Sequence, residues 1–434
     1  MESIWRKGQT MPHFPPLRGT VKTQVLVIGG GMAGLLCAHR LHQAGVDCCV
    51  VEENRIAGGV TGNTTAKITA QHGLIYRKLL ENLGQERAKL YLQANLFALD
   101  AYRELCRSIP CDFEEKDHIV FSRDDRAGLE AELDALEKLG YPAQLAENPE
   151  LPFPTVGGVR FPAQGQFDPL QFLAAIAEDL TIYQQTPVLR LTRQGADTDH
   201  GRIQAEAVIV ATHFPMFNRH GSYFLKLYQQ RSYVLALENA PIPPGMYLED
   251  RENGLSLRSR GSTLLLGGGG HRTGCPGGGW EELEQAARQY YPEARISCRW
   301  ATQDCMSLDG LPYIGRYSAA TPNLYVATGF NKWGMTTSML AAHILRDLIT
   351  GKDNPYAALF SPSRSMLCPQ LGINLKESAK NLLTPSSRRC THLGCALKWN
   401  PQEHSWDCPC HGSRFSEDGT RLDNPAKKDL PPED

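Results

Sequence analysis

The chain has 434 residues, a hydrophobic fraction of 41%, a charged fraction of 21% and a formal net charge of -2. This length suits about two or three domains, and the composition is that of an ordinary globular protein. The near-neutral charge gives no electrostatic reason to expect nucleic acid or an anionic membrane as a partner. No run of about 18 apolar residues occurs, so the sequence predicts no membrane span.

Cysteine usage indicates the redox environment. Thirteen cysteines are present, and nine of them lie before residue 390 without the spacing of a disulfide framework. Residues 1–20 lack the apolar segment of a secretory signal. Because such scattered thiols are typical of reduced compartments, we expect a cytoplasmic protein.

The first predicted elements are a strand, a glycine-rich loop, a helix and a second strand. Residues 23–28 are a β-branched apolar run, typical of a buried parallel strand. Residues 29–34 have the pattern Gly-x-Gly-x-x-Gly, residues 35–41 have helical spacing, and residues 48–51 form a strand that ends at Glu52. This order predicts a dinucleotide site, with a glycine-rich turn that binds nothing as the alternative.

Each residue of that motif has a physical task. Gly29 permits the tight turn, Gly31 lets the backbone approach a pyrophosphate, and Gly34 lets the helix pack on the strand. The pyrophosphate then lies on free N–H groups at the positive end of the helix. Glu52 can accept hydrogen bonds from an adenosine ribose, and its charge disfavours a 2′-phosphate.

A second nucleotide-contact region is predicted late in the chain. A strand over residues 323–328 leads into a glycine-containing loop at 329–335, and a helix over 336–349 follows at once. A helix N-terminus preceded by glycines suits the edge of a flavin ring. The polar segment 58–72 is too polar for a core and is a further candidate contact.

Residues from about 21 to 364 resemble the D-amino-acid-oxidase-type FAD superfamily, which includes glycine oxidase, sarcosine oxidase and gamma-glutamylputrescine oxidase. The resemblance implies an α/β fold within residues 1–362, with a Rossmann-like FAD-binding domain and an inserted α+β substrate domain. The implied FAD part comprises about 20–75, 185–215 and 300–352, and the implied substrate part comprises about 76–184 and 216–299.

The resemblance also implies FAD contacts, residue by residue. They are Gly29, Gly31, Gly34 and Glu52 on the ADP side, Val188 on the adenine side, Thr64, Thr65 and Lys67 on the flavin-side loop, and Gly329, Lys332, Gly334, Met335 and Thr336 around the flavin ring. The glycines at 267–270 are not followed by a helix, so they predict no second, NAD(P)H-binding site. The electron donor is therefore expected to be a small organic molecule.

Two loops near the C-terminus each offer one thiol and one imidazole. They contain Cys390 and His392 in a Cys-x-His arrangement, and Cys408 and His411 in a Cys-x-x-His arrangement. Two thiolates and two imidazoles are the ligand set of a Rieske [2Fe–2S] cluster. A zinc finger has a different spacing, so zinc is the weaker alternative, beside loops that bind no metal.

The loops resemble those of respiratory Rieske proteins. The resemblance implies a disulfide between Cys395 and Cys410. Ser413 is expected to donate to a cluster sulfur, whereas Phe415 stands where respiratory relatives have a tyrosine and cannot donate. We therefore predict a midpoint potential below the Rieske maximum of about +300 mV.

The whole chain resembles bacterial fusions of an FAD-dependent amine-oxidase-type domain with a C-terminal Rieske domain, here a small all-β module. One departure is that residues 363–389 predict a linker with a helix rather than the strands that normally precede the first ligand loop. Residues 390–434 thus form a shortened ligand module, and its cluster loading depends on its surroundings.

The candidate catalytic residues are Lys332, His72 and His271. Lys332 would stabilise a reduced flavin, His72 would lie over the ring, and His271 with Arg272 would reach a carboxylate or amine. For each, a satisfied polar side chain without a catalytic role is the alternative. Tyr233, Tyr247 and Trp333 could line an aromatic cage for a cationic amine, but core packing is the commoner explanation for such residues. A covalent flavin bond to Cys305 is not expected.

These features predict oxidation of a small amine or amino acid by FAD, with electrons passed to the Rieske cluster and then to an external acceptor. A first alternative is an oxidase that returns electrons to O₂ and has a vestigial cluster module. A second is a non-catalytic FAD protein whose metal loops dock a partner.

Overall fold

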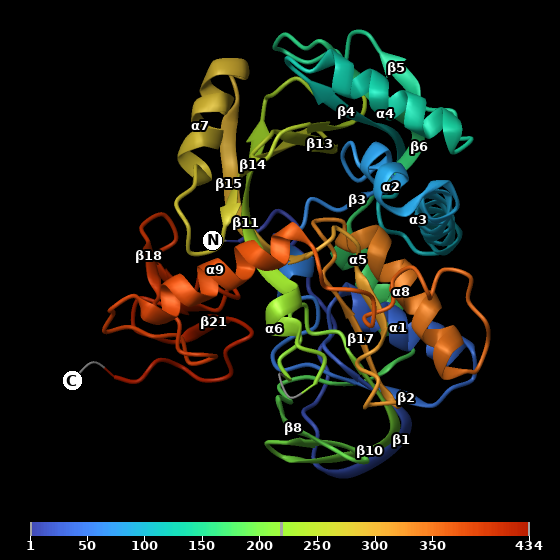
Figure 1. Cartoon of the computed structure of the whole chain (residues 1–434), viewed down its shortest axis with the longest axis vertical. Helices are drawn as coiled ribbons and strands as arrows, with labels where there is room; N and C mark the ends of the chain where they lie inside the picture. Colours follow the sequence, from blue (N-terminus) through green and yellow to red (C-terminus); the bar gives the residue numbers. More distant parts are fainter. Residues whose placement is uncertain (1, 218–219, 433–434) are drawn as a thin grey trace.

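The computed structural model describes residues 2–217 and 220–432. Two large sheets lie side by side, and a small C-terminal sheet packs beside the second of them (Figure 1). This arrangement confirms the predicted α/β fold with a second sheet domain and a small all-β module.

The first sheet contains the glycine-loop motif. Its central strand β1 pairs in parallel with β2 and β10, and β10 pairs in parallel with β17. The apolar runs that predicted these strands are buried on both faces, as in other parallel sheets. In order across the sheet, the strands are β16 (Tyr313–Arg316), β17 (Leu324–Thr328), β10 (Gly201–Val210), β1 (Gly19–Ile28), β2 (Cys48–Val51) and β7 (Thr181–Tyr183), with β9 (Gly195–Thr198) and β8 (Val188–Thr192) added beside β10.

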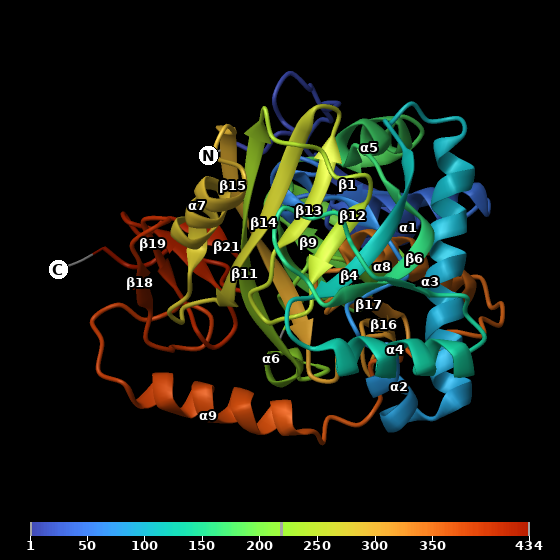
Figure 2. The ribbon, with the colours of Figure 1, turned by 90° about the horizontal axis from the view of Figure 1, so that it is seen from above.

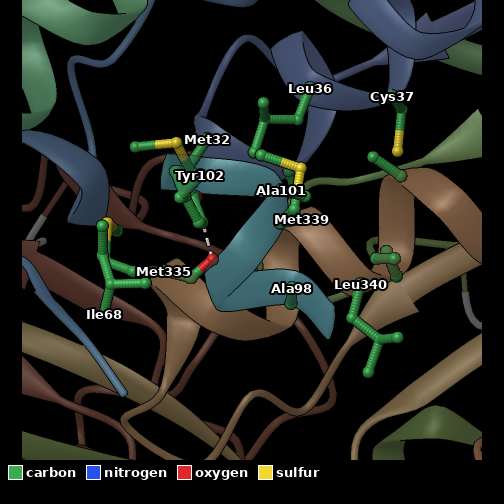
Figure 3. Close-up of a cluster of buried hydrophobic side chains, with 14 of the residues drawn as sticks. Met32, Leu36, Cys37, Ile68, Ala98, Ala101, Tyr102, Met335, Met339 and Leu340 are labelled. Carbon is green, nitrogen blue, oxygen red and sulfur yellow. Dashed lines mark hydrogen bonds between the residues drawn. The ribbon is translucent and has the colours of Figure 1, made fainter. Parts of the chain in front are cut away.

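Helices α1 (Met32–Gln43) and α8 (Gly334–Ile349) pack against each other, and α3 (Gln85–Cys106) packs on α8. Figure 3 shows the apolar contact between these helices, with Tyr102 among the side chains of α1 and α8. The Tyr102 hydroxyl donates to the carbonyl of Met335 at 2.9 Å. Because both helices begin at the two predicted nucleotide-contact loops, their packing fixes those loops relative to each other.

The second sheet of the oxidoreductase part is mostly antiparallel. Its order is β15 (Arg295–Ser307), β11 (Leu227–Glu238), β14 (Thr263–Arg272), β13 (Ser256–Arg260), β12 (Met246–Glu249), β4 (Glu114–Ser122), β6 (Gly157–Gln166) and β3 (Lys67–Ile68), with β5 (Gln144–Ala146) beside β6. Helix α7 (Gly279–Tyr290) packs on β14 and β11, and α4 (Arg126–Lys138) packs on β6. The other short helices are α2 (Tyr76–Leu83), α5 (Pro169–Ala177), α6 (Tyr223–Lys226) and the 3₁₀ turn η1 (Val60–Asn63).

Two strands depart from the expected division of the chain. The sequence placed residues from about 300 onward in the FAD part, but β15 pairs with β11 along its length and lies in the second sheet. Conversely, β7 was placed in the substrate part, but it pairs with β2 in the first sheet. In both cases strand pairing across distant segments decides the sheet, and this pairing leaves no local pattern in the sequence.

The C-terminal part begins with helix α9 (Pro369–Leu383), which lies along one edge of the molecule (Figure 2). Four short antiparallel strands follow, namely β18 (Lys398–Asn400), β19 (Ser405–Asp407), β20 (Arg414–Ser416) and β21 (Arg421–Asp423). Across the described ranges, none of the helices combines the length and apolar character that a membrane crossing needs.

Candidate functional site

The glycine loop brings the start of α1 close to the first sheet. Gly29 has a φ of +110°, and a Cβ there would lie 2.5 Å from the carbonyl oxygen of Ala211. A Cβ at Gly34 would lie 1.8 Å from the carbonyl oxygen of Gly29, so both positions exclude a side chain. Gly31 caps α1 without any side-chain hydrogen bond. The N–H of Met32 donates to Thr61 Oγ1 at 3.0 Å, so a pyrophosphate would use the other N–H groups of the first turn.

Glu52 lies beside this loop at the end of β2. Its carboxylate accepts hydrogen bonds from Gly30 N at 2.7 Å and from Asn54 N at 2.9 Å. Burial raises the pKa of Glu52, and these backbone hydrogen bonds oppose the rise. The carboxylate is thus held at the position where the motif needs a hydrogen-bond acceptor for a ribose.

The adjacent carbonyls of Thr64 and Thr65 are both held by hydrogen bonds. The carbonyl of Thr64 accepts from Trp5 Nε1 at 2.7 Å, and the carbonyl of Thr65 accepts from Arg258 Nη1 at 2.9 Å. Val188, the predicted adenine-side residue, is buried in β8 of the first sheet. Thr64 and Thr65 are thus fixed through their backbone carbonyls, and Val188 contributes apolar surface.

Lys67 points into the second sheet. Its Nζ donates to the carbonyl of Tyr247 at 2.6 Å and to Ser256 Oγ at 2.8 Å. Burial lowers the pKa of Lys67 well below its usual value, and the nearby Arg258 lowers it further. Within the described ranges, no carboxylate pairs with this ammonium group.

The start of α8 is tied to the segment before His72. Thr336 Oγ1 accepts from Thr69 N at 3.1 Å and donates to Thr69 O at 2.9 Å. The His72 ring stacks on Trp333 with a centroid distance of 4.7 Å. Its Nδ1 lies 2.6 Å from Tyr91 Oη, and its Nε2 lies 2.9 Å from Thr69 O. Burial lowers the pKa of His72 to about 3, so the ring is neutral and both nitrogens are engaged.

The structure adds His118, which the sequence analysis missed. Its Nδ1 lies 2.9 Å from Gln71 Oε1, and its buried Nε2 has no hydrogen-bond partner among the described residues. Burial lowers the pKa of His118 well below its usual value, and Lys67 and His72 add to the effect. A single histidine in a strand belongs to no motif, so only the fold reveals that these three groups form one buried polar cluster.

Lys332 is exposed and has a φ of +72°. Its Nζ would lie 3.5 Å from a Cβ at Gly270, so it lies over β14. The buried carboxyl of Asp304 has a pKa raised by burial and lowered again by Lys332. The preceding Asn331 donates its backbone N–H to the carbonyl of Cys305 at 3.1 Å. The loop at residues 329–335 therefore rests directly on β15.

His271 is not part of the His72 cluster. Its Nε2 lies 2.9 Å from Tyr233 Oη, which also donates to Glu403 of the C-terminal module at 3.1 Å. Arg272 Nε donates to the carbonyl of Pro409 in the second ligand loop at 3.1 Å. The structure thus places both candidate substrate contacts of β14 against the C-terminal module.

The three aromatic residues considered for a cage do not meet. Trp333 stacks on His72, whereas Tyr233 and Tyr247 are buried in the core of the second sheet. Cys305 is buried, its Sγ lies 3.6 Å from Thr328 Oγ1, and burial raises the pKa of its thiol to about 12. A thiol in this state is a poor nucleophile.

The four predicted cluster ligands lie together. Cys390 and Cys408 are 3% and 1% exposed, and the hydrogen bond between their thiols is the main cause that lowers the pKa of Cys390 to about 7. The His392 and His411 rings are 4.9 Å apart and perpendicular. His411 Nδ1 is buried and has no hydrogen-bond partner in the described part of the chain. Two thiols and two imidazoles with an unused buried nitrogen fit a Rieske [2Fe–2S] cluster.

The predicted disulfide between Cys395 and Cys410 is present and joins the two ligand loops. The sulfurs of Cys395, Cys408 and Cys410 also lie within 4.8 Å of one another, as in a metal site. Because two of these sulfurs are bonded to each other, they are not thiolates and do not form a zinc site.

The oxidoreductase part supplies much of the base on which the ligand loops rest. Gln229 Nε2 donates to the carbonyl of His411 at 2.7 Å, and Gln303 Nε2 donates to the carbonyl of Gly412 at 2.9 Å. His411 Nε2 lies 2.9 Å from the carbonyl oxygen of Phe224. The second ligand loop is therefore supported by β11, β15 and α6.

A buried ion cluster strengthens the same contact. Glu403 pairs with Arg231 of β11 and with Arg414 of its own module, the latter at 2.9 Å. Arg414 also pairs with Asp407 at 3.0 Å. Burial alone would raise the pKa of Glu403, but the two arginines lower it below its usual value. Removing one partner of such a buried network leaves an unpaired charge.

The sequence matches two protein families in succession. Residues 24–348 match the family described as FAD dependent oxidoreductase, and residues 372–432 match the Rieske [2Fe-2S] domain. The second match includes most of α9 as well as both ligand loops.

Similar proteins agree with this division. A putative Rieske 2Fe-2S iron-sulfur protein of Bacillus subtilis (strain 168), YhfW, is 33% identical, over 99% of this chain and 97% of that protein. Glycine oxidase from Geobacillus kaustophilus has a similar fold, with a TM-score of 0.66 and 21% identity over 79% of this chain and 99% of its own. L-proline dehydrogenase from P. horikoshii has a TM-score of 0.67 and 18% identity, over 81% and 98%.

Proposed function

The chain belongs to the FAD-dependent oxidoreductase family and carries a Rieske [2Fe–2S] domain, and on this premise we propose that it oxidises a small amino acid or amine and delivers the electrons to its own cluster. FAD accepts a hydride from the carbon next to the substrate nitrogen, and the cluster accepts one electron at a time. An external acceptor, a protein or O₂, then receives the electrons.

The residues that would hold FAD come from two helix starts. The loop of Gly29, Gly31 and Gly34 offers N–H groups to the pyrophosphate, and Glu52 accepts from the ribose. Residues 329–336 would border the flavin ring, and the positive charge of Lys332 would stabilise a reduced flavin.

The buried polar cluster supports an amino acid over a simple amine. Lys67 is buried with no carboxylate partner among the described residues, and burial lowers its pKa, so a ligand carboxylate nearby would favour its charged form. His118 Nε2 is a further buried group with no hydrogen-bond partner in the same ranges. His72 holds the loop through both ring nitrogens, which argues for an orienting role rather than that of a base.

The observation that carries the proposal is the contact between the second ligand loop and the oxidoreductase sheet. His411 is held by Gln229 of β11 and by the carbonyl of Phe224 of α6. Strand β15, which pairs with β11, holds Gly412 through Gln303 and accepts a backbone hydrogen bond from Asn331. Such a fixed contact suits electron transfer within one chain, because geometry is held without a docking step.

The test is anaerobic mixing of the purified holoprotein with a panel of amino acids and simple amines. Bleaching of flavin absorbance, followed by the anisotropic electron paramagnetic resonance (EPR) signal of a reduced [2Fe–2S] cluster, is expected with at least one amino acid. Fast peroxide release in air from a protein without that signal would instead establish the oxidase with a vestigial module. No bleaching by any compound would favour the non-catalytic alternative.

A further inference from the structure

Two glutamines hold the backbone of the second ligand loop. Gln229 of β11 donates to the carbonyl of His411 at 2.7 Å and to that of Asn424 at 3.2 Å. Gln303 of β15 donates to the carbonyl of Gly412 at 2.9 Å, and its Oε1 accepts from Thr273 Oγ1 at 3.0 Å. Both side chains are buried, so these hydrogen bonds form away from water, where an unpaired carbonyl is costly.

The loop approaches the glutamines too closely for a side chain of its own. Gly412 has a φ of +81°, and a Cβ there would lie 2.6 Å from Gln229 Cβ. The neighbouring Gly274 is equally tight, because its Cβ would lie 2.6 Å from Pro409 N. The position of the loop is therefore set by direct contact with β11 and β14.

The same strands also contact residues 329–336, which are expected to border the flavin ring. Gln303 is two residues before Cys305 on β15, and the carbonyl of Cys305 accepts from Asn331 N at 3.1 Å. Gln229 pairs with Cys305 across β11 and β15. One side-chain hydrogen bond, a short piece of strand and one backbone hydrogen bond thus connect the ligand loop to residues 329–336.

We propose that Gln229 and Gln303 are positioning residues that fix the cluster as an intramolecular electron acceptor. The hydrogen bond between Cys305 and Asn331 is the link to residues 329–336. The inference rests on the proposed function, which supplies reduced FAD as the donor. Each transfer oxidises the flavin by one electron and reduces the iron pair by one. The proton carried by reduced flavin is released to solvent.

The experiment uses the holoprotein and needs no identified substrate. A laser flash with 5-deazariboflavin as the photoreductant delivers one electron, and the first-order redistribution between flavin and cluster is followed by absorbance. Gln303→Glu keeps the side-chain size but loses the Nε2 donor, Gln303→Met removes both hydrogen bonds without adding charge, and Gln229→Met tests the second contact. Gln402→Ala is the matched control, because Gln402 contacts Gly278 and Trp280 across the same interface outside the ligand loops.

The three test variants are expected to slow redistribution by about tenfold or more, because a small displacement of reacting groups has a large effect on rate. Iron content and EPR g-values should stay unchanged, and the amides of residues 408 and 410–413 of the oxidised variants should exchange hydrogen faster. Gln402→Ala should keep the wild-type rate. Wild-type rates in the test variants, or loss of the cluster from all of them, would overturn the inference. A wild-type protein without redistribution would instead overturn the transfer step of the proposed function.

Discussion

His411 Nε2 lies 2.9 Å from the carbonyl oxygen of Phe224, so a predicted cluster ligand faces its own oxidoreductase part. The ring of Phe214 lies against both imidazoles, with centroid distances of 6.1 Å to His411 and 6.3 Å to His392. The imidazole side of the cluster site therefore contacts Phe214, which follows strand β10 of the first sheet.

Substitution of a predicted ligand tests the cluster directly. Cys408→Ser is expected to abolish the [2Fe–2S] EPR signal and lower the iron content, while flavin absorbance remains, because the two sites share no ligands. Cys368→Ser is the control, since Cys368 lies outside the ligand loops and its Sγ lies 3.6 Å from the carbonyl oxygen of Leu308, a contact that serine can replace. An unchanged EPR signal in Cys408→Ser would contradict the ligand assignment.

Gly29→Ala tests the dinucleotide loop. A Cβ at this position meets the carbonyl of Ala211, and the φ of +110° is unfavourable for alanine. Loss of bound FAD and a lower melting temperature are expected, with destabilisation of about 1–3 kcal/mol. Gly372→Ala in α9, which would meet no atom within 4 Å, should retain FAD. Flavin content after gel filtration and thermal unfolding provide the measurement.

The disulfide between Cys395 and Cys410 encloses a short loop, with a sequence separation of 15. In the chain-entropy model such a bond stabilises the folded state by about 3 kcal/mol. The double variant Cys395→Ala, Cys410→Ala is therefore expected to unfold its C-terminal module at lower denaturant concentration and to lose iron faster. Denaturation followed by cluster absorbance checks this, and equal midpoints for variant and wild type would contradict it.

Phe415→Tyr tests how the environment of the cluster sets its potential. Phe415 is fully buried against Cys390 and Cys408, where it offers no hydrogen bond. The wild-type midpoint is expected below the Rieske maximum of about +300 mV, and a tyrosine hydroxyl should raise it. Ser413→Ala should lower it, because Ser413 hydrogen-bonds the Cys390 thiol. Redox titration by EPR decides the matter, and a wild-type midpoint at the maximum would refute the prediction.

Buried histidines make stability sensitive to acid. Burial lowers the pKa of His343 to about 3, with Arg40 and Arg346 adding to the effect. Since the unfolded chain binds a proton near the ordinary value of about 6.5, stability is lost as pH falls from there toward the folded-state pKa. The slope for one such group is at most about 1.4 kcal/mol per pH unit. His343→Leu should reduce the difference between urea midpoints at neutral pH and at lower pH, and an unchanged difference would contradict this cause.

Local sequence motifs predict those features whose geometry is set by residues close together in the chain. The glycine loop has the tight geometry that its motif predicts, and the predicted disulfide joins the two ligand loops, whereas the cofactor contacts of Glu52 and of the four cluster ligands stay predictions. These patterns succeed because turn geometry and ligand spacing are set within a few residues.

Side-chain direction across sheets was harder to predict. Lys67 turns into the second sheet, and His271 contacts Tyr233 rather than the His72 cluster. His118 lies near Lys67 and His72, although no sequence motif predicts this. Each depends on which strands become neighbours, and strand order between distant segments has no signature in local composition. The sequence of the shortened C-terminal module shows no strands on which its ligand loops could rest. Strands β11 and β15 supply this support, and their position beside the module has no local signature either.

The tight glycine contacts between the two parts have an evolutionary consequence. A Cβ at Gly279 would lie 2.1 Å from Gln402 Oε1, and one at Gly274 would collide with Pro409. Grafting the terminal module of another Rieske protein onto this oxidoreductase should therefore fail unless that module carries a proline and a glycine at the positions of Pro409 and Gly412. The two halves of the gene are expected to change together, as one inherited unit rather than as an exchangeable cassette.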